Sequence, residues 1–169
     1  NSIILRGDVL NINLRLLKTS AGDSIEIDTL LAPLKVDYGY TDDIKVIGSI
    51  TNNAGRIELN IEVATVFNTE CARCLEPVSF EVSYDYEDRI VFEESDEYIS
   101  LSSDEFNLEE YVYEELSITL PFRVLCNDDC KGLCPDCGIN LNVSDCSCKN
   151  EHIDPRLEVL KKLLDKKED

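Results

Sequence analysis

The sequence predicts an α+β protein, in which an antiparallel β-meander forms a partly curled sheet that packs against a helix. Three observations carry this prediction. Three runs of alternating apolar and polar residues follow one another, a capped helical pattern comes after them, and six of the eight cysteines lie within 126–148. These patterns divide the chain into a β-rich domain over 1–92, an acidic linker over 93–107 and a third part over 108–169.

The strands are predicted from period-two alternation, which places every second side chain on one face of a sheet. Leu10–Leu16 alternates in this way and predicts a first strand, and "SIEID" begins a second extended segment after the turn-rich "TSAGDS". The three clearest runs are joined by short connections, which favours an antiparallel meander with one buried face. Their apolar sides are Ile44, Val46, Gly48 and Ile50; Ile57, Leu59, Ile61, Val63, Thr65 and Phe67; and Val78, Phe80, Val82, Tyr84 and Tyr86.

Two helices are predicted after the strands. Asn107 is a favourable N-cap for a helix beginning at Leu108, and acidic residues in its first turn suit the helix dipole. Pro121 limits the length of this helix. A terminal helix begins at "DPRLEVLKKLL", with Asp154 as the N-cap and Pro155 at the first helical position.

The composition restricts the function. The chain has 169 residues, with 35 Asp and Glu against 16 Lys and Arg and a net charge of -19. Such a surface repels phosphate backbones, so direct nucleic-acid binding is disfavoured and a basic protein partner is favoured. No apolar run reaches the roughly 20 residues that span a bilayer, and the first residues do not form a secretory signal. We therefore expect a cytoplasmic protein without a membrane partner.

Clustered cysteines in a cytoplasmic protein indicate metal binding or redox activity, because disulfides rarely persist there. The segment "CPDCG" has the spacing of a zinc knuckle, and Gly138 permits the positive φ that such a turn often needs. A structural zinc ion takes four ligands in a tetrahedron. We predict Zn bound by Cys134, Cys137, Cys146 and Cys148, with Cys126 and Cys130 as alternates.

A second C-x2-C pair, Cys71 and Cys74, lies in the predicted connection between two strands. Three interpretations remain open at this point. The pair is half of a metal site that two cysteines of the cluster complete, a redox pair with lowered pKa values, or a tight turn with two half-buried thiols.

The sequence predicts no enzyme. His152 is the only histidine, which gives little support to Ser–His or Cys–His catalysis, and there is no Gly-rich phosphate loop. An all-thiolate metal site lacks the open position that a metal-dependent hydrolase needs. The alternative to a non-catalytic factor is a thiol-redox or iron-binding electron-transfer protein.

Several motifs together resemble the YceD family of large ribosomal RNA subunit accumulation proteins, in the form found in Gram-positive bacteria. They are "CARCLEP", "CKGLCPDCGINLN" with the trailing "CSC", and "IDPRLEVLKKLL". The resemblance runs from about Leu10 to the C-terminus, and residues 1–9 depart from the usual start of the family. It implies a non-catalytic role in the synthesis, processing or assembly of large-subunit ribosomal RNA. With the charge, it favours a basic ribosomal protein or a pre-ribosomal particle as the partner. Because other branches keep the C-x2-C pair without the cluster, it also suggests two independent thiol sites and a stabilising role for the cluster.

Overall fold

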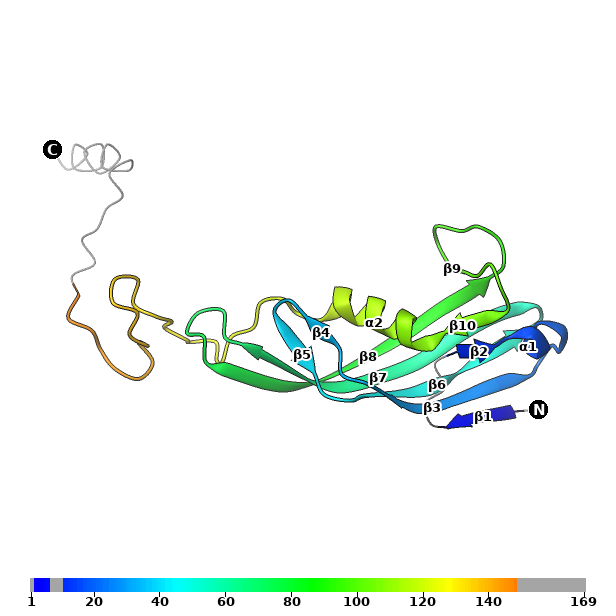
Figure 1. The fold of residues 1–169 in the computed structure, drawn as a ribbon, viewed down its shortest axis with the longest axis horizontal. Helices are drawn as coiled ribbons and strands as arrows, with labels where there is room; N and C mark the ends of the chain where they lie inside the picture. The colour runs from blue at the N-terminus through cyan, green and yellow to red at the C-terminus, as the bar shows by residue number, and fades with distance from the viewer. Residues whose placement is uncertain (1, 7–10, 149–169) are drawn as a thin grey trace.

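The computed structural model describes residues 2–6 and 11–148. The predicted terminal helix that begins at Asp154, and His152 before it, lie outside the described residues. Figure 1 shows an elongated sheet with a helix along one face and the cysteine-rich segment at one end.

The main sheet has eight strands and is largely antiparallel. Its centre is formed by four long strands, each antiparallel to the one before: β3 (Ser24–Leu31), β6 (Ile44–Asn53), β7 (Arg56–Glu70) and β8 (Pro77–Val91). Two strands at its edges pair in parallel: β1 (Ser2–Arg6) with β3, and β9 (Ile99–Ser100) with β8. The sheet stays open, because the outer strands that are described do not pair with one another.

Short strands complete the architecture at both ends of the long ones. The hairpin of β4 (Lys35–Val36) and β5 (Gly39–Thr41) pairs through β5 with the end of β7, next to the turn that leads into β8. A separate two-stranded sheet joins β2 (Asn11–Asn13) to β10 (Glu105–Asn107).

The core lies on one face of β6 and β7, where burial alternates with period two as the sequence predicts. Leu59, Val63 and Phe67 are fully buried, and each buried side chain of this size contributes about 1.5–3 kcal/mol relative to exposure. Gly48 falls in this pattern for a steric reason. A Cβ atom there would lie 2.0 Å from the carbonyl oxygen of Asn60, so only glycine lets the two backbones approach this closely.

Helix α2 (Leu108–Thr119) covers this face of the sheet (Figure 1). Its side chains at helical spacing, Leu108, Val112 and Leu116, are buried in the same core. The Asn107 side chain accepts a hydrogen bond from the Glu110 N–H at 3.2 Å, so it is the predicted N-cap.

The predicted first strand, Leu10–Leu16, is only partly correct. β2 ends at Asn13, and a five-residue helix, α1 (Arg15–Thr19), follows. Leu14 and Leu17 are buried while Leu16 is 69% exposed, so the apolar side chains follow a helical turn rather than an alternating strand. The apolar spacing of this short run is compatible with a strand and with a helical turn. In the structure Leu17, and not Leu16, packs into the core.

The fold is more β-rich than the predicted α+β class suggests, because the described residues contain only two short helices. The acidic segment 93–107 contributes β9 and β10, and its Phe106 is buried in the core. Lys18 pairs with Asp104 at 2.7 Å and further attaches this segment to α1. Within the described residues, neither helix has the length or the apolar character needed to cross a membrane.

Candidate metal centres

The structure gathers the eight cysteines into two sets of four. Within each set all four sulfur atoms lie within 4.8 Å of one another, and all eight residues are free thiols. We call Cys71, Cys74, Cys126 and Cys130 the sheet-end group, and Cys134, Cys137, Cys146 and Cys148 the loop group.

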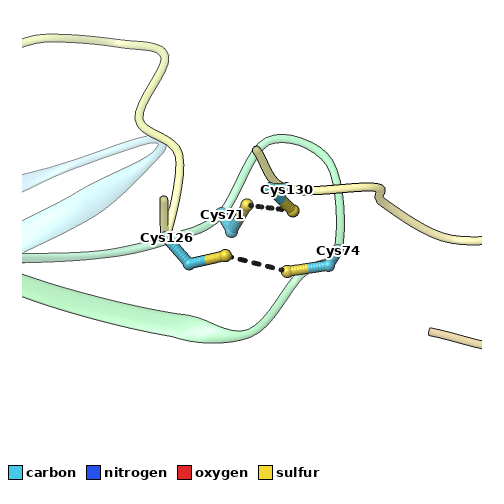
Figure 2. Close-up of side chains that lie close together, drawn as sticks. All are labelled: Cys71, Cys74, Cys126 and Cys130. Atoms are coloured by element: carbon cyan, nitrogen blue, oxygen red, sulfur yellow. Dashed lines mark hydrogen bonds between the residues drawn. The ribbon is translucent and has the colours of Figure 1, made fainter. Parts of the chain in front are cut away.

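The sheet-end group joins two distant parts of the chain. Cys71 and Cys74 lie in the turn between β7 and β8, whereas Cys126 and Cys130 come from the segment after α2 (Figure 2). The sulfur of Cys71 is 3.7 Å from that of Cys130, and the sulfurs of Cys74 and Cys126 are 3.6 Å apart. Four thiolates bound to zinc at about 2.3 Å in a tetrahedron have sulfur atoms about 3.8 Å apart. The sheet-end group therefore already has the spacing of a four-thiolate metal site.

Both C-x2-C turns have the same backbone geometry. The N–H of Leu75 donates to the carbonyl of Cys71 at 2.9 Å, and the N–H of Gly138 donates to the carbonyl of Cys134 at 2.9 Å. The residue after the second cysteine has positive φ in each, 61° for Leu75 and 74° for Gly138. The positive φ predicted for Gly138 is thus confirmed. In the sheet-end group the residue at the matching position of the turn is Leu75, which adopts a positive φ as well.

The sheet-end group is mostly buried. Cys71, Cys74 and Cys130 are enclosed by Val78, Leu125 and Leu133, while Cys126 is exposed. Burial opposes ionisation of Cys71, but backbone N–H groups that face its sulfur, including that of Arg73, outweigh burial and lower its pKa to about 6.

Cys126 behaves in the opposite way. Its hydrogen bond with the Cys130 thiol, followed by the partial desolvation of its sulfur among the other thiols, raises its pKa to about 12. Four neighbouring thiols cannot all ionise without a compensating cation, since each thiolate disfavours the next. The sheet-end group therefore contains one cysteine, Cys71, that ionises easily and another, Cys126, that keeps its proton at neutral pH.

The loop group is built within one short segment. The N–H of Cys134 donates to the carbonyl of Ile139 at 2.8 Å, and Leu133 and Asn140 form a short antiparallel bridge around the turn. Cys134 is buried and its sulfur lies 3.4 Å from that of Cys146. Backbone N–H groups of Cys137 and Asp136 lower the pKa of Cys134 to about 7, whereas the hydrogen bond with the Cys137 thiol raises that of Cys148 to about 12.

Asn142 connects the two groups. It belongs to the loop between Cys137 and Cys146, yet its amide Nδ2 donates to the sulfur of Cys130 at 3.3 Å. Its Oδ1 accepts from the backbone N–H of Lys131 at 2.8 Å. The loop of one group thus supplies a hydrogen bond to a sulfur of the other. The sequence gives no signal for this residue beyond its place between two cysteines.

Arg73 forms a second connection. Its carbonyl accepts from the N–H of Leu133 at 3.1 Å, and its guanidinium donates to the carbonyl of Cys130 at 2.8 Å. The side chain of Arg73 therefore supports the thiol segment through the backbone, and it is the backbone N–H of Arg73 that faces the sulfur of Cys71, at 3.5 Å.

These observations place every cysteine named from the sequence. The four predicted ligands of the cluster lie together in the loop group. Cys126 and Cys130, the predicted alternates, lie instead with Cys71 and Cys74, as in the first of the three interpretations of that pair. Among the described residues, each group consists of four cysteine sulfurs without a histidine or carboxylate, a donor set that suits a closed structural metal site.

Comparison with known proteins gives one family. The sequence model described as "Large ribosomal RNA subunit accumulation protein YceD" matches residues 59–164, which include both thiol groups.

Curated proteins also match the chain, and one of those described here carries the same family name. An uncharacterized protein of Mycobacterium tuberculosis is 37% identical over 103 residues, which cover 56% of this chain and 49% of the relative. An uncharacterized protein of Mycobacterium leprae is 30% identical over 135 residues, 73% of this chain and 56% of the relative. A maize protein named "Large ribosomal RNA subunit accumulation protein YCED homolog 1, chloroplastic" is 24% identical over 140 residues, 62% of this chain and 48% of its own length. The chain thus spans about half the length of the curated relatives it matches, and no solved structure matches it.

Proposed function

The chain belongs to the YceD family, and we propose that it is a non-catalytic factor for the accumulation of large-subunit ribosomal RNA that holds one structural zinc ion in each thiol group. The family match over residues 59–164 carries the first part of this proposal. The grouping of all eight cysteines into two four-thiol sets carries the second.

Zinc is the metal that fits the donor set best. Four thiolates favour zinc or iron over magnesium and calcium, which prefer oxygen ligands. A closed set leaves no coordination position for water or substrate, so the metal stabilises the fold and does not catalyse. An irregular segment such as 121–148, which contains a single isolated bridge and has little core of its own, gains most from this kind of cross-link.

The partner is a basic ribosomal protein or a pre-ribosomal particle in the cytoplasm. A net charge of -19 attracts basic proteins and repels free RNA. The factor would then affect ribosomal RNA synthesis, processing or assembly through a protein that itself binds the RNA.

Metal analysis tests the cofactor. We expect two zinc ions per chain and a colourless protein. Iron held by four thiolates absorbs visible light, so a coloured protein with stoichiometric iron would replace this proposal with the electron-transfer alternative.

The cellular role has a separate test. Cells depleted of the protein should lose large-subunit ribosomal RNA relative to small-subunit RNA, and the tagged protein should retain large-subunit precursors at moderate salt. An unchanged RNA ratio with no ribosomal protein retained would overturn the proposed role, whatever the metal content.

A further inference from the structure

Leu75 combines a strained backbone conformation with an exposed side chain. Its φ of 61° is costly for leucine, and the matching position of the loop group is occupied by glycine, at a φ of 74°. The Leu75 side chain is 58% exposed, so burial within the protein does not compensate. A strained residue whose side chain points to solvent indicates a role in contact with another molecule.

A groove lies beside it. Leu75 and Phe122 line the same hollow of about 580 Å³, next to Cys71 of the sheet-end group. Phe122 is 81% exposed and Tyr40, also in the lining, is 54% exposed. Large apolar side chains gathered around one concavity are typical of a binding surface rather than of isolated surface residues.

The walls of the groove are fixed by hydrogen bonds. The segment that carries Phe122 is held to the thiol turn by the Ala72 N–H, which donates to the carbonyl of Val124 at 2.8 Å. The hydroxyl of Tyr38 donates to the carbonyl of Leu120 at 3.3 Å, and the hydroxyl of Thr69 donates to the carbonyl of Tyr38 at 2.6 Å. The groove is therefore formed before any partner binds, which lowers the entropic cost of docking.

The charge of the groove selects the partner. Asp37 and Glu70 are exposed in its lining, and no lysine or arginine lies in that lining. The guanidinium of the neighbouring Arg73 lies outside this lining and donates a hydrogen bond to the carbonyl of Cys130. Carboxylates beside an apolar groove, on a chain of net charge -19, complement a cationic polypeptide and repel a phosphate backbone.

We propose that this groove docks a segment of a basic protein, which places an apolar side chain against Leu75 and Phe122 and a lysine or arginine beside Asp37 and Glu70. This inference rests on the proposed function, since the basic partner is the one proposed above. The inference adds two things to the proposed function. It locates the docking surface beside the sheet-end group, and it requires the docked segment of the partner to carry an apolar side chain next to a lysine or arginine.

Two apolar substitutions and one double substitution of the carboxylates test the surface, and one variant serves as the control. Leu75→Gly removes the side chain and keeps the turn, because glycine adopts this φ readily. Phe122→Ser removes the second apolar residue. Leu16→Ser is the control, because Leu16 is 69% exposed and lies in α1, at the opposite end of the sheet (Figure 1).

The measurement is retention of identified large-subunit ribosomal proteins from nuclease-treated extract at several salt concentrations. We expect the wild type and Leu16→Ser to retain the same basic protein, and Leu75→Gly and Phe122→Ser to retain at least about tenfold less, with the zinc content of all four unchanged. Asp37→Asn with Glu70→Gln should reduce the salt dependence of retention.

The other outcomes separate the two proposals. If the wild type and every variant retain the protein equally, the groove is not the docking surface and the proposed function stands. If nuclease treatment abolishes retention, RNA connects this protein to the ribosomal protein, and the docking inference is overturned. If the wild type retains no ribosomal protein, the proposed partner fails first, and the docking inference that rests on it fails too.

Discussion

The two thiol groups share a turn and a donor set but differ in how much chain they close. In the sheet-end group, the paired sulfurs belong to residues 52 and 59 positions apart, and the group ties the β7–β8 turn to the segment after α2. In the loop group the sulfurs of Cys134 and Cys146 belong to residues 12 positions apart, and all four cysteines come from one short segment of the chain. The same chemistry therefore forms a tertiary cross-link in one place and orders a local loop in the other.

Chain length makes this difference quantitative. Loop-closure entropy grows as (3/2)RT ln n, so closing 52 residues costs the unfolded chain about 1.3 kcal/mol more than closing 12. A metal in the sheet-end group also holds buried core elements together, since Cys71, Cys74 and Cys130 pack with Val78, Leu125 and Leu133. We therefore expect global stability to depend on the sheet-end group and local order on the loop group.

Cys71→Ser should have the largest effect. It removes a buried ligand, and losing even a third of the ~10–16 kcal/mol that structural zinc supplies is about 4 kcal/mol. For a chain of this size that lowers the melting temperature by roughly 8–16 °C. Calorimetry alongside zinc analysis would show the loss of one zinc ion with this shift.

Cys134→Ser is the matched variant of the loop group. It should also release one zinc ion, but the melting temperature should change by no more than about 2 °C. Hydrogen exchange should show lost protection at amides of residues 132–144 and preserved protection in β6 and β7. Equal thermal shifts in the two variants would remove the distinction between the groups.

Acidification should weaken zinc binding to both groups. The pKa is raised for Cys74 and Cys126 in one group and for Cys146 and Cys148 in the other, so each zinc displaces at least two protons near pH 7. Protons compete with zinc for the cysteine sulfurs. The contribution of zinc to the free energy of unfolding is therefore greatest at high pH and is lost as the pH falls. Two protons per zinc correspond to about a 100-fold loss of affinity per pH unit.

Titration calorimetry in buffers of different ionisation enthalpy would count these protons directly. The lowered pKa of Cys71, about 6, adds a further loss as the pH falls through that value. Release of fewer than two protons per zinc would contradict the raised pKa values.

Asn142→Ala should loosen the sheet-end group from a distance. The amide of Asn142 lowers the pKa of Cys130 by donating to its sulfur, although burial, the largest influence, opposes ionisation. Loss of such an outer partner typically costs 10–100-fold in metal affinity, so we expect zinc to leave the sheet-end group about tenfold faster during chelation.

Asn127→Ala is the control for this variant, because Asn127 donates to the exposed Cys126 at 3.5 Å from the next position in the chain. It should change the rate less than Asn142→Ala does. An equal change would mean that any amide near a sulfur has this effect, and that the connection between the groups has no special role.

Exchanging the residue after each second cysteine should give the smallest and most asymmetric effects. Gly138→Leu should destabilise the loop group by up to about 1 kcal/mol, because the conformational cost of a positive φ, about 1–2 kcal/mol, exceeds what the lower entropy of leucine in the unfolded chain returns, and no atom lies within 4 Å of the added Cβ. Leu75→Gly should be neutral within about 0.5 kcal/mol, because relief of that cost is offset by the greater entropy of glycine in the unfolded chain. Chemical denaturation of the two variants checks both values.

Local patterns in the sequence were sufficient to predict part of the fold. The alternation in β6 and β7 gave the correct buried face because those strands are long and lie against a single core. The alternation of Leu10–Leu16 was misleading, since a run of seven residues fits a strand and a helical turn equally well. Asn107 was recognisable as an N-cap because capping depends only on neighbouring residues.

The same limit applies to the thiols. The loop group could be proposed from spacing because its four members lie within 15 residues of one another. The partners of Cys71 and Cys74 depend on where α2 delivers the chain, and spacing alone leaves several choices open. Asn142 depends on both groups being in place, so no local pattern reveals it.

The long separation within the sheet-end group has a consequence for the nascent chain. Cys74 is synthesised 52 residues before Cys126, and at 5–20 residues per second this takes roughly 3–10 s. During that time the β7–β8 turn has two thiols but not four, while the strands that carry it can already pair. The second half of the site arrives only after α2, so a closed sheet-end group exists only on a chain whose β-sheet and covering helix have already been translated.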